Sequence, residues 1–96
     1  MVLDYSKESF SEEKLTRYVK EAVNILVENQ VSQTMILSSY KINTILRSVY
    51  GIKFRIDRIG RVLARLAKQN QYLRLETKIP KYQVSLSHFS GFNFQE

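Results

Sequence analysis

Apolar residues recur at steps of three and four along the first third of the chain, which is the spacing of one face of a helix. This stripe consists of Leu15, Tyr18, Val19, Ala22, Ile25 and Leu26. It predicts a helix that ends at about Glu28. Ser9 has capping-box spacing to Glu12, and Ser11 is a competing N-cap.

Two further stripes predict two more helices. The first predicts a helix over residues 39–50 and consists of Ile42, Ile45, Leu46 and Val49. Ser38 or Ser39 can cap its start, and Gly51 is suited to the position after its end. After a turn at residues 51–54, the segment 55–69 predicts the third helix, with a buried face of Ile56, Ile59, Val62, Leu63, Leu66 and Ala67.

Alternation with period two follows over residues 72–77 and again over residues 82–86, with Lys78-Ile79-Pro80-Lys81 between them. Two such runs joined by a short link predict an antiparallel hairpin. Its expected apolar face is Tyr72 or Leu73 with Leu75, paired with Val84 and Leu86. Residues 33–37 form a brief strand or the lead-in to the second helix.

The predicted fold class is therefore α+β, in the order helix, possible short strand, helix, turn, helix, hairpin. At 96 residues, of which 44% are hydrophobic, the chain suits one domain with one core. We expect a single domain over residues 1–96, with irregular tails at 1–10 and 87–96.

The stretch 42–86 resembles the winged helix-turn-helix superfamily. The resemblance lies in INTILRSVYG, in RIDRIGRVLARLAKQNQYL and in the strand YQVSLS. It implies three helices with a C-terminal antiparallel β-hairpin wing. With the first helix and the short strand, it covers about residues 9–87. Many members of the superfamily have Gly where this chain has Asn70, and Asn also tolerates a left-handed conformation. In composition the chain resembles small archaeal and archaeal-virus members.

Positive charge is concentrated in one part of the chain. Residues 53–81 hold nine basic and two acidic residues, a charge of +7, whereas the rest carries −1 of the total +6. Such a basic segment on a nearly neutral body indicates a surface that faces a polyanion. The four basic residues opposite the apolar stripe of the third helix are Arg58, Arg61, Arg65 and Lys68, with Arg55 at the edge.

These observations predict a site for double-stranded DNA. A helix fits the major groove, where arginine contacts guanine edges or phosphates. The resemblance implies that the wing, with Lys78 and Lys81, touches a minor groove or adjacent phosphates. Protection of an edge strand against aggregation explains these two lysines equally well. Lys53 is a further candidate beside the third helix. The weaker candidates belong to the second helix or its start: Ser38, Ser39, Tyr40, Lys41 and Arg47.

Two residues of the third helix, Asp57 and Gly60, have structural explanations as well as functional ones. Asp57 in its first turn favours the positive end of the helix dipole, and it has i,i+4 spacing to Arg61. Gly60 costs about 1 kcal/mol relative to Ala in a helix. Its expected reason is close packing against the second helix, with close approach of a DNA backbone as the alternative.

Catalytic and metal-binding signals are weak. The one histidine, His88, cannot form a histidine cluster, and the chain has no cysteine. The three glycines form no phosphate-cradling motif. We expect no enzyme activity, no cofactor, no metal and no small-molecule ligand. Without cysteine, a signal peptide or a membrane-spanning apolar run, the expected location is the cytoplasm.

Aromatic and apolar residues near both ends exceed what a three-helix core obviously absorbs. They are Val2, Leu3, Tyr5, Phe10, Phe89, Phe92 and Phe94. They predict a homodimer interface built with the first helix, or else tails that fold back over their own domain.

The function expected from these patterns is duplex DNA binding, most simply as a transcriptional regulator. The alternative is a winged-helix adaptor that binds proteins in a replication, transcription or membrane-remodelling assembly. Single-stranded nucleic acid is less favoured, because aromatic residues do not interleave with the basic ones.

Overall fold

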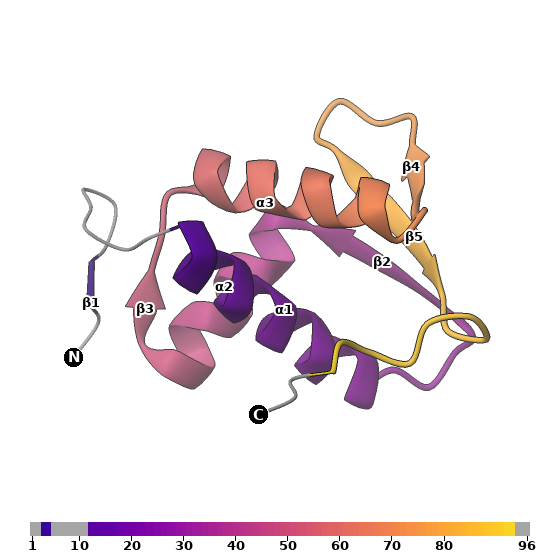
Figure 1. Ribbon diagram of the computed structural model, residues 1–96, viewed down its shortest axis with the longest axis horizontal. Coiled ribbons are helices and arrows are strands. Elements are labelled where there is room, and N and C mark those ends of the chain that lie inside the picture. The colour runs from indigo at the N-terminus through magenta and orange to yellow at the C-terminus, as the bar shows by residue number, and fades with distance from the viewer. Residues whose placement is uncertain (1–2, 5–11, 94–96) are drawn as a thin grey trace.

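The computed structural model describes residues 3–4 and 12–93 of the chain. The described part is a small α+β domain of three helices and an antiparallel three-stranded sheet (Figure 1), as the sequence predicts. The helices are α1 (Glu12–Glu28), α2 (Ser39–Tyr50) and α3 (Ile56–Gln69). The strands are β1 (Leu3–Asp4), β2 (Thr34–Ser38), β3 (Ile52–Lys53), β4 (Leu73–Leu75) and β5 (Lys81–Ser85).

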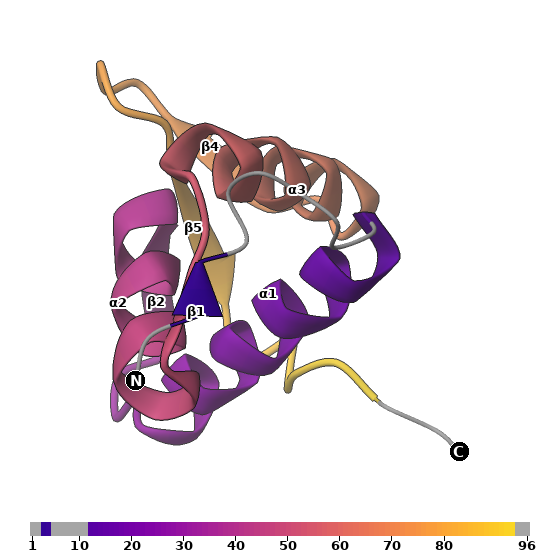
Figure 2. The same cartoon turned by 90° about the vertical axis from the view of Figure 1, so that its left-hand side faces the viewer.

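All three helices lie where the apolar spacing predicts them. In Figure 2 they pack around a common centre, with α3 crossing above α1 and α2. The end of α1 at Glu28 is confirmed, while the serines proposed to cap its start lie outside the described residues. None of the described helices is long and apolar enough to cross a lipid bilayer.

Both ends of α2 are fixed by local interactions. The Ser38 side chain accepts a hydrogen bond from the backbone N–H of Lys41 at 3.3 Å, so Ser38 rather than Ser39 is the N-cap. Gly51 ends the helix in a left-handed conformation with φ 65°, and its N–H donates to the carbonyl of Arg47 at 3.2 Å. The predicted role of Gly51 is confirmed.

The exit of α3 differs from the expectation for Asn70. This residue has φ −105°, and the left-handed conformation, with φ 59°, falls on Gln71 instead. The Asn70 side chain donates to the carbonyl of Leu66 at 2.8 Å, while the N–H of Tyr72 donates to that of Ala67 at 2.9 Å. The Asn70 side chain thus pairs with a backbone carbonyl at the end of the helix, and the left-handed residue that redirects the chain is the next one, Gln71.

The three-stranded sheet has the order β2-β5-β4, with both pairs antiparallel. The short segment before α2 is therefore a strand. Met35 pairs with Val84 and Leu37 with Tyr82, and all four side chains are buried against the helices. The hairpin is not the last part of the fold, because residues 86–93 continue past β5 and return along α1 (Figure 1).

The predicted apolar face of the hairpin is wrong for β4. Leu73 pairs with Gln83 and is 60% exposed, and Leu75 pairs with Lys81 and is half-buried. Residues paired across an antiparallel ladder share a face, so the buried Tyr82 and Val84 place both leucines on the opposite face. β4 is an edge strand beyond the cover of the helices, and alternation alone does not reveal which face is covered.

A second, parallel pairing joins β1 to β3, with Leu3 opposite Ile52 and Asp4 opposite Lys53. The sequence predicts only a turn at residues 51–54. Ile52 and Phe54 are buried in the core, so the connection between α2 and α3 is anchored by apolar packing as well as by the Gly51 cap.

The segment after β5 folds over the domain. Phe89 and Phe92 pack against the core, and their rings contact each other at 5.0 Å between centroids. The Asn24 side chain donates to the Phe92 carbonyl at 2.9 Å and accepts from the Phe92 N–H at 2.7 Å. These two aromatics therefore have partners within the chain. The homodimer stays a prediction, and the side chains of the other end residues that motivate it lie outside the described part.

Core packing by α3 gives the first testable prediction. Leu63 and Leu66 are 1% and 2% exposed, and replacing either by Ala should lower the free energy of unfolding by about 2–5 kcal/mol. The matched control is Leu73→Ala, because Leu73 lies on the solvent face and has little packing to lose. Chemical denaturation of the three variants measures the difference. Equal small losses for all three would contradict the assigned core.

Candidate nucleic-acid interface

The orientation of α3 is fixed by its apolar stripe. Five residues of the stripe are buried: Ile59, Val62, Leu63, Leu66 and Ala67. At 100° per residue, Arg61 and Lys68 point farthest from this stripe, and both are exposed. Their side chains have no recorded hydrogen bond or ion pair within residues 12–93. Packing on one side of the helix therefore presents two available cations on the other.

Of the other two basic residues of the predicted face, Arg65 contacts α1. The Arg65 guanidinium donates to Glu12 Oε2 at 3.0 Å and to Thr16 Oγ1 at 2.6 Å, so α1 holds it. Arg58 is half-buried. The four residues thus share one side of α3, as predicted, but only Arg61 and Lys68 extend freely into solvent.

Arg55 immediately precedes α3 and forms an ion pair within the chain. Its guanidinium donates to both carboxylate oxygens of Asp57, at 3.1 and 3.2 Å. The expected pairing of Asp57 with Arg61 is therefore wrong, and Arg61 is left available. Lys53, on β3, is exposed beyond the N-terminal end of α3.

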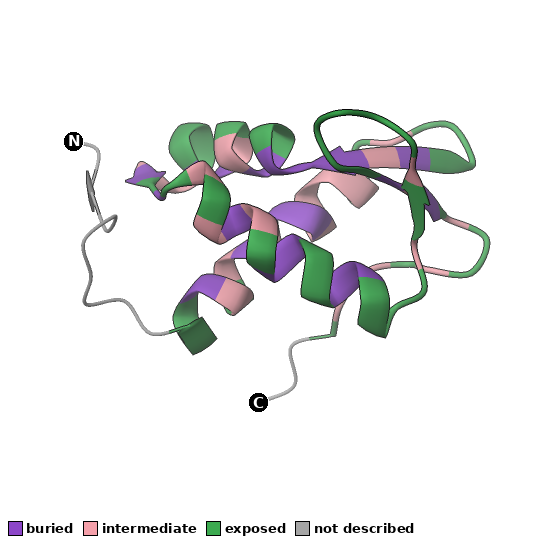
Figure 3. Ribbon diagram, turned by 90° about the horizontal axis from the view of Figure 1, so that it is seen from above, coloured by how far each residue is buried: buried purple, intermediate pink, exposed green. Residues whose placement is uncertain are grey.

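The β4–β5 loop, residues 76–80, projects from the body beside α3 (Figures 1 and 2). It is exposed along its whole length (Figure 3). Lys78 lies in the loop and Lys81 at its end, both exposed and with no ion pair recorded in the described part of the chain. The Thr77 hydroxyl donates to the carbonyl of Ile79 and Pro80 fixes φ, which together restrain the loop.

Three candidates at the start of α2 have different surroundings. Ser39 is buried, whereas the Tyr40 side chain is 53% exposed. Lys41 Nζ donates to the carbonyl of Ile36 at 2.7 Å, which ties that ammonium back to β2. Tyr40 is therefore the one side chain of this group that reaches the surface freely.

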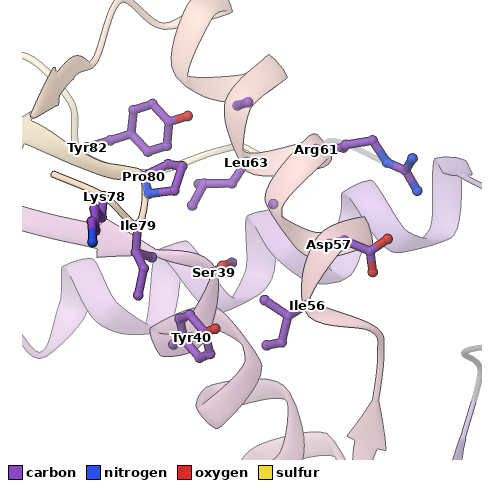
Figure 4. A pocket seen from close by; sticks show the side chains of 12 residues that line it. Ser39, Tyr40, Ile56, Asp57, Arg61, Leu63, Lys78, Ile79, Pro80 and Tyr82 are labelled. Carbon is purple, nitrogen blue, oxygen red and sulfur yellow. The ribbon is translucent and has the colours of Figure 1, made fainter. Parts of the chain in front are cut away.

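An open groove of about 410 Å³ separates α3 from the β4–β5 loop, with the start of α2 at one end. We call it the α3–loop groove. Most of its lining is apolar or aromatic and consists of Tyr40, Ile56, Gly60, Leu63, Ala64, Ile79, Pro80 and Tyr82. Its polar and charged lining consists of Ser39, Asp57, Arg61 and Lys78. In Figure 4, Tyr40, Ile56 and Ile79 point toward a shared space, and the Arg61 guanidinium points away from it.

Sequence reasoning missed this groove. The one local signal was Gly60 with Ala64, four positions apart on α3 and therefore on one side of it. Packing against α2 does not require Gly60, because a Cβ there meets only Ser39 Cβ, at an ordinary 4.0 Å. The packing explanation expected for this glycine is therefore wrong.

Other chemistry has little support in the described residues. His88 is exposed, and residues 12–93 contain no group of three or more His, Cys, Asp or Glu arranged to hold a metal ion. Burial, together with a hydrogen bond to Glu21, raises the pKa of Tyr50 to about 12. Burial also raises the pKa of Tyr72. Both tyrosines are neutral at physiological pH and lie outside the groove.

Comparison with known proteins assigns no family. No family model, curated protein or solved structure matches this chain. The functional argument therefore depends on the charge and geometry of the described residues.

Proposed function

We propose that this chain is a winged helix-turn-helix domain that binds double-stranded DNA, with α3 in the major groove and the β4–β5 loop as the wing. The carrying observation is that Arg61 of α3 and Lys78 of the loop line one groove, and that Lys68 of α3 and Lys81 at the end of the loop are exposed as well. None of the four has an ion pair recorded in residues 12–93. Regulation of transcription is the simplest role for such binding.

The element order supports the proposed fold. A helix, a strand, two helices and a hairpin follow one another, and the β2-β5-β4 order brings the hairpin beside α3. The α2–α3 pair, joined by the Gly51 cap and β3, corresponds to the helix-turn-helix unit. The resemblance of residues 42–86 to this superfamily is independent support from the sequence.

Shape and charge complementarity support duplex DNA as the ligand. The major groove, about 12 Å wide, admits a helix, and the 14 residues of α3 suffice to cross it. Arg61 has the fork that pairs with guanine O6 and N7, whereas lysines of the loop suit phosphates. The start of α2 adds backbone N–H groups beside Tyr40, where a phosphate is favoured.

The main experiment is binding to mixed duplexes over a range of salt concentrations, followed by selection from random duplexes. We expect affinity that falls steeply with salt, because phosphate contacts release counterions. Arg61→Ala should lose about 1–3 kcal/mol of discrimination at particular base pairs, while Lys78→Ala weakens binding evenly and lowers the salt slope by about one. Arg17→Ala, an equal charge loss on α1 at a residue outside the candidate interface, is the control.

Absence of salt-sensitive duplex binding at low ionic strength would overturn the proposal. Salt-sensitive capture of an acidic protein without duplex binding would favour the adaptor function instead. Identical effects of Arg61→Ala and Lys78→Ala would show a non-specific DNA coat and not a sequence reader.

A second prediction follows from the Arg65–Glu12 pair. Glu12→Gln should raise duplex affinity, because it removes a negative charge beside α3 and releases Arg65 from its carboxylate partner. Stability should change little, since exposed ion pairs contribute only about 0–1 kcal/mol. Glu28→Gln makes the same charge change at the far end of α1 and serves as the control. An equal gain for both variants would mean that only net charge matters.

A further inference from the structure

We propose that the outer edge of β4 binds an extended acidic segment of a partner protein, which adds to the sheet as a fourth strand. In this segment apolar and acidic residues alternate, with an acidic side chain opposite Arg74 and apolar side chains beside Leu73 and Leu75. β4 lies at the margin of the sheet (Figure 1) and contributes no residue to the α3–loop groove. The proposal therefore does not depend on DNA binding.

The two outer strands of the sheet, β2 and β4, differ in what occupies their edges. The carbonyl of Thr34 in β2 accepts hydrogen bonds from Gln30 Nε2 at 3.2 Å and from Ser32 Oγ at 2.8 Å. The carbonyl of Ile36 accepts one from Lys41 Nζ at 2.7 Å. Side chains of the chain itself thus cover the edge of β2, which protects it against pairing with another strand.

The backbone groups at the outer edge of β4 have no such cover. The N–H of Leu86 donates to the carbonyl of Gln33 at 2.8 Å, and because the direction alternates along β5, Gln83 turns its backbone groups toward β4. Gln83 pairs with Leu73, so the groups of Leu73 face β5 and those of Arg74 face outward. Within residues 12–93 no hydrogen bond to the Arg74 N–H or carbonyl is recorded. This donor and this acceptor are available to an added strand.

The side chains of β4 add an apolar surface to this edge. Leu73 is exposed and Leu75 is half-buried, and both lie on the face of the sheet away from the helices. Leu73 also borders a second open groove, of about 340 Å³, whose lining mixes the rings of Tyr72 and Phe89 with polar side chains such as Ser85. Apolar side chains of an added strand would cover Leu73 and have space in this groove, and burial of that surface favours association.

Charge determines which strand fits. Residues 73–75 and their ladder partners 81–83 contain two cations, Arg74 and Lys81, and no acid. Arg74 is exposed, with no ion pair recorded in residues 12–93. Antiparallel pairing with a second copy at Arg74 would set two arginines directly opposite each other, which is destabilising, whereas an acidic residue there forms a favourable cross-strand pair. The edge therefore disfavours a second copy and favours an acidic strand.

The first test measures the sequence preference of the edge. The probes are capped seven-residue peptides: one alternates Val and Glu, one has Lys in place of Glu, and one has the first composition with all Val residues together. We expect the full chain to bind the alternating acidic peptide about fivefold or more tightly than the other two. Arg74→Glu should reverse the preference to the Lys peptide. Arg17→Glu, the same charge change on α1, is the control and should keep the wild-type preference.

The second test asks whether the peptide binds as a strand. Amide hydrogen exchange at Arg74 should slow when the alternating acidic peptide binds, because its N–H gains a partner. N-methylation of the peptide at every Glu removes the donors of the edge that faces β4 and should abolish binding. N-methylation at every Val changes the opposite edge and should leave binding intact, because successive backbone groups alternate in direction along a strand.

Several outcomes would refute the proposal. Equal binding of the alternating and the segregated acidic peptides, or unchanged exchange at Arg74, would show attraction by charge alone. Protection of the Arg74 amide without peptide, together with concentration-dependent self-association, would assign the edge to a second copy. Duplex binding is measured separately: its failure leaves this proposal standing if the peptide binds, and its success does not rescue the proposal if the peptide fails to bind.

Discussion

Burial of the apolar stripe of α3 is the constraint on which the rest of the domain depends. Each buried Ile, Leu or Val of this stripe contributes about 1.5–3 kcal/mol, whereas an exposed ion pair such as Arg65–Glu12 contributes about 0–1 kcal/mol. Packing therefore decides how α3 is rotated, and the charged side chains take partners only within the positions left to them. Arg61 and Lys68 face solvent because the opposite side of the helix is buried.

Features that depend on local physics could be predicted from the sequence. The three helices follow from stripes with a period near 3.6, and the Gly51 cap follows from the low cost of a left-handed glycine. The basic side of α3 could be predicted from the same helical period, because residues opposite a buried stripe face solvent. In each case the determining contacts lie within a few positions along the chain.

Features that depend on distant contacts could not be predicted. Alternation in β4 does not say which face the helices cover, and the exposed Leu73 results from its pairing with Gln83 of β5. The partners Arg65 and Glu12 are 53 positions apart, so no spacing rule joins them. The groove is of the same kind, because α2, α3 and the loop each supply part of its lining.

The cations that carry the proposed function gain no stabilisation from ion pairs within residues 12–93. Arg61, Lys68, Lys78 and Lys81 have the same sign, and residues 12–93 supply them with no recorded carboxylate partner. Their mutual repulsion is weakened by salt and removed by a polyanion that lies among them. Gly60 follows the same logic, since alanine would stabilise α3 without a clash. Ion pairs within the described domain therefore do not account for these four cations, and packing does not account for Gly60, whereas the proposed duplex ligand gives a reason for both.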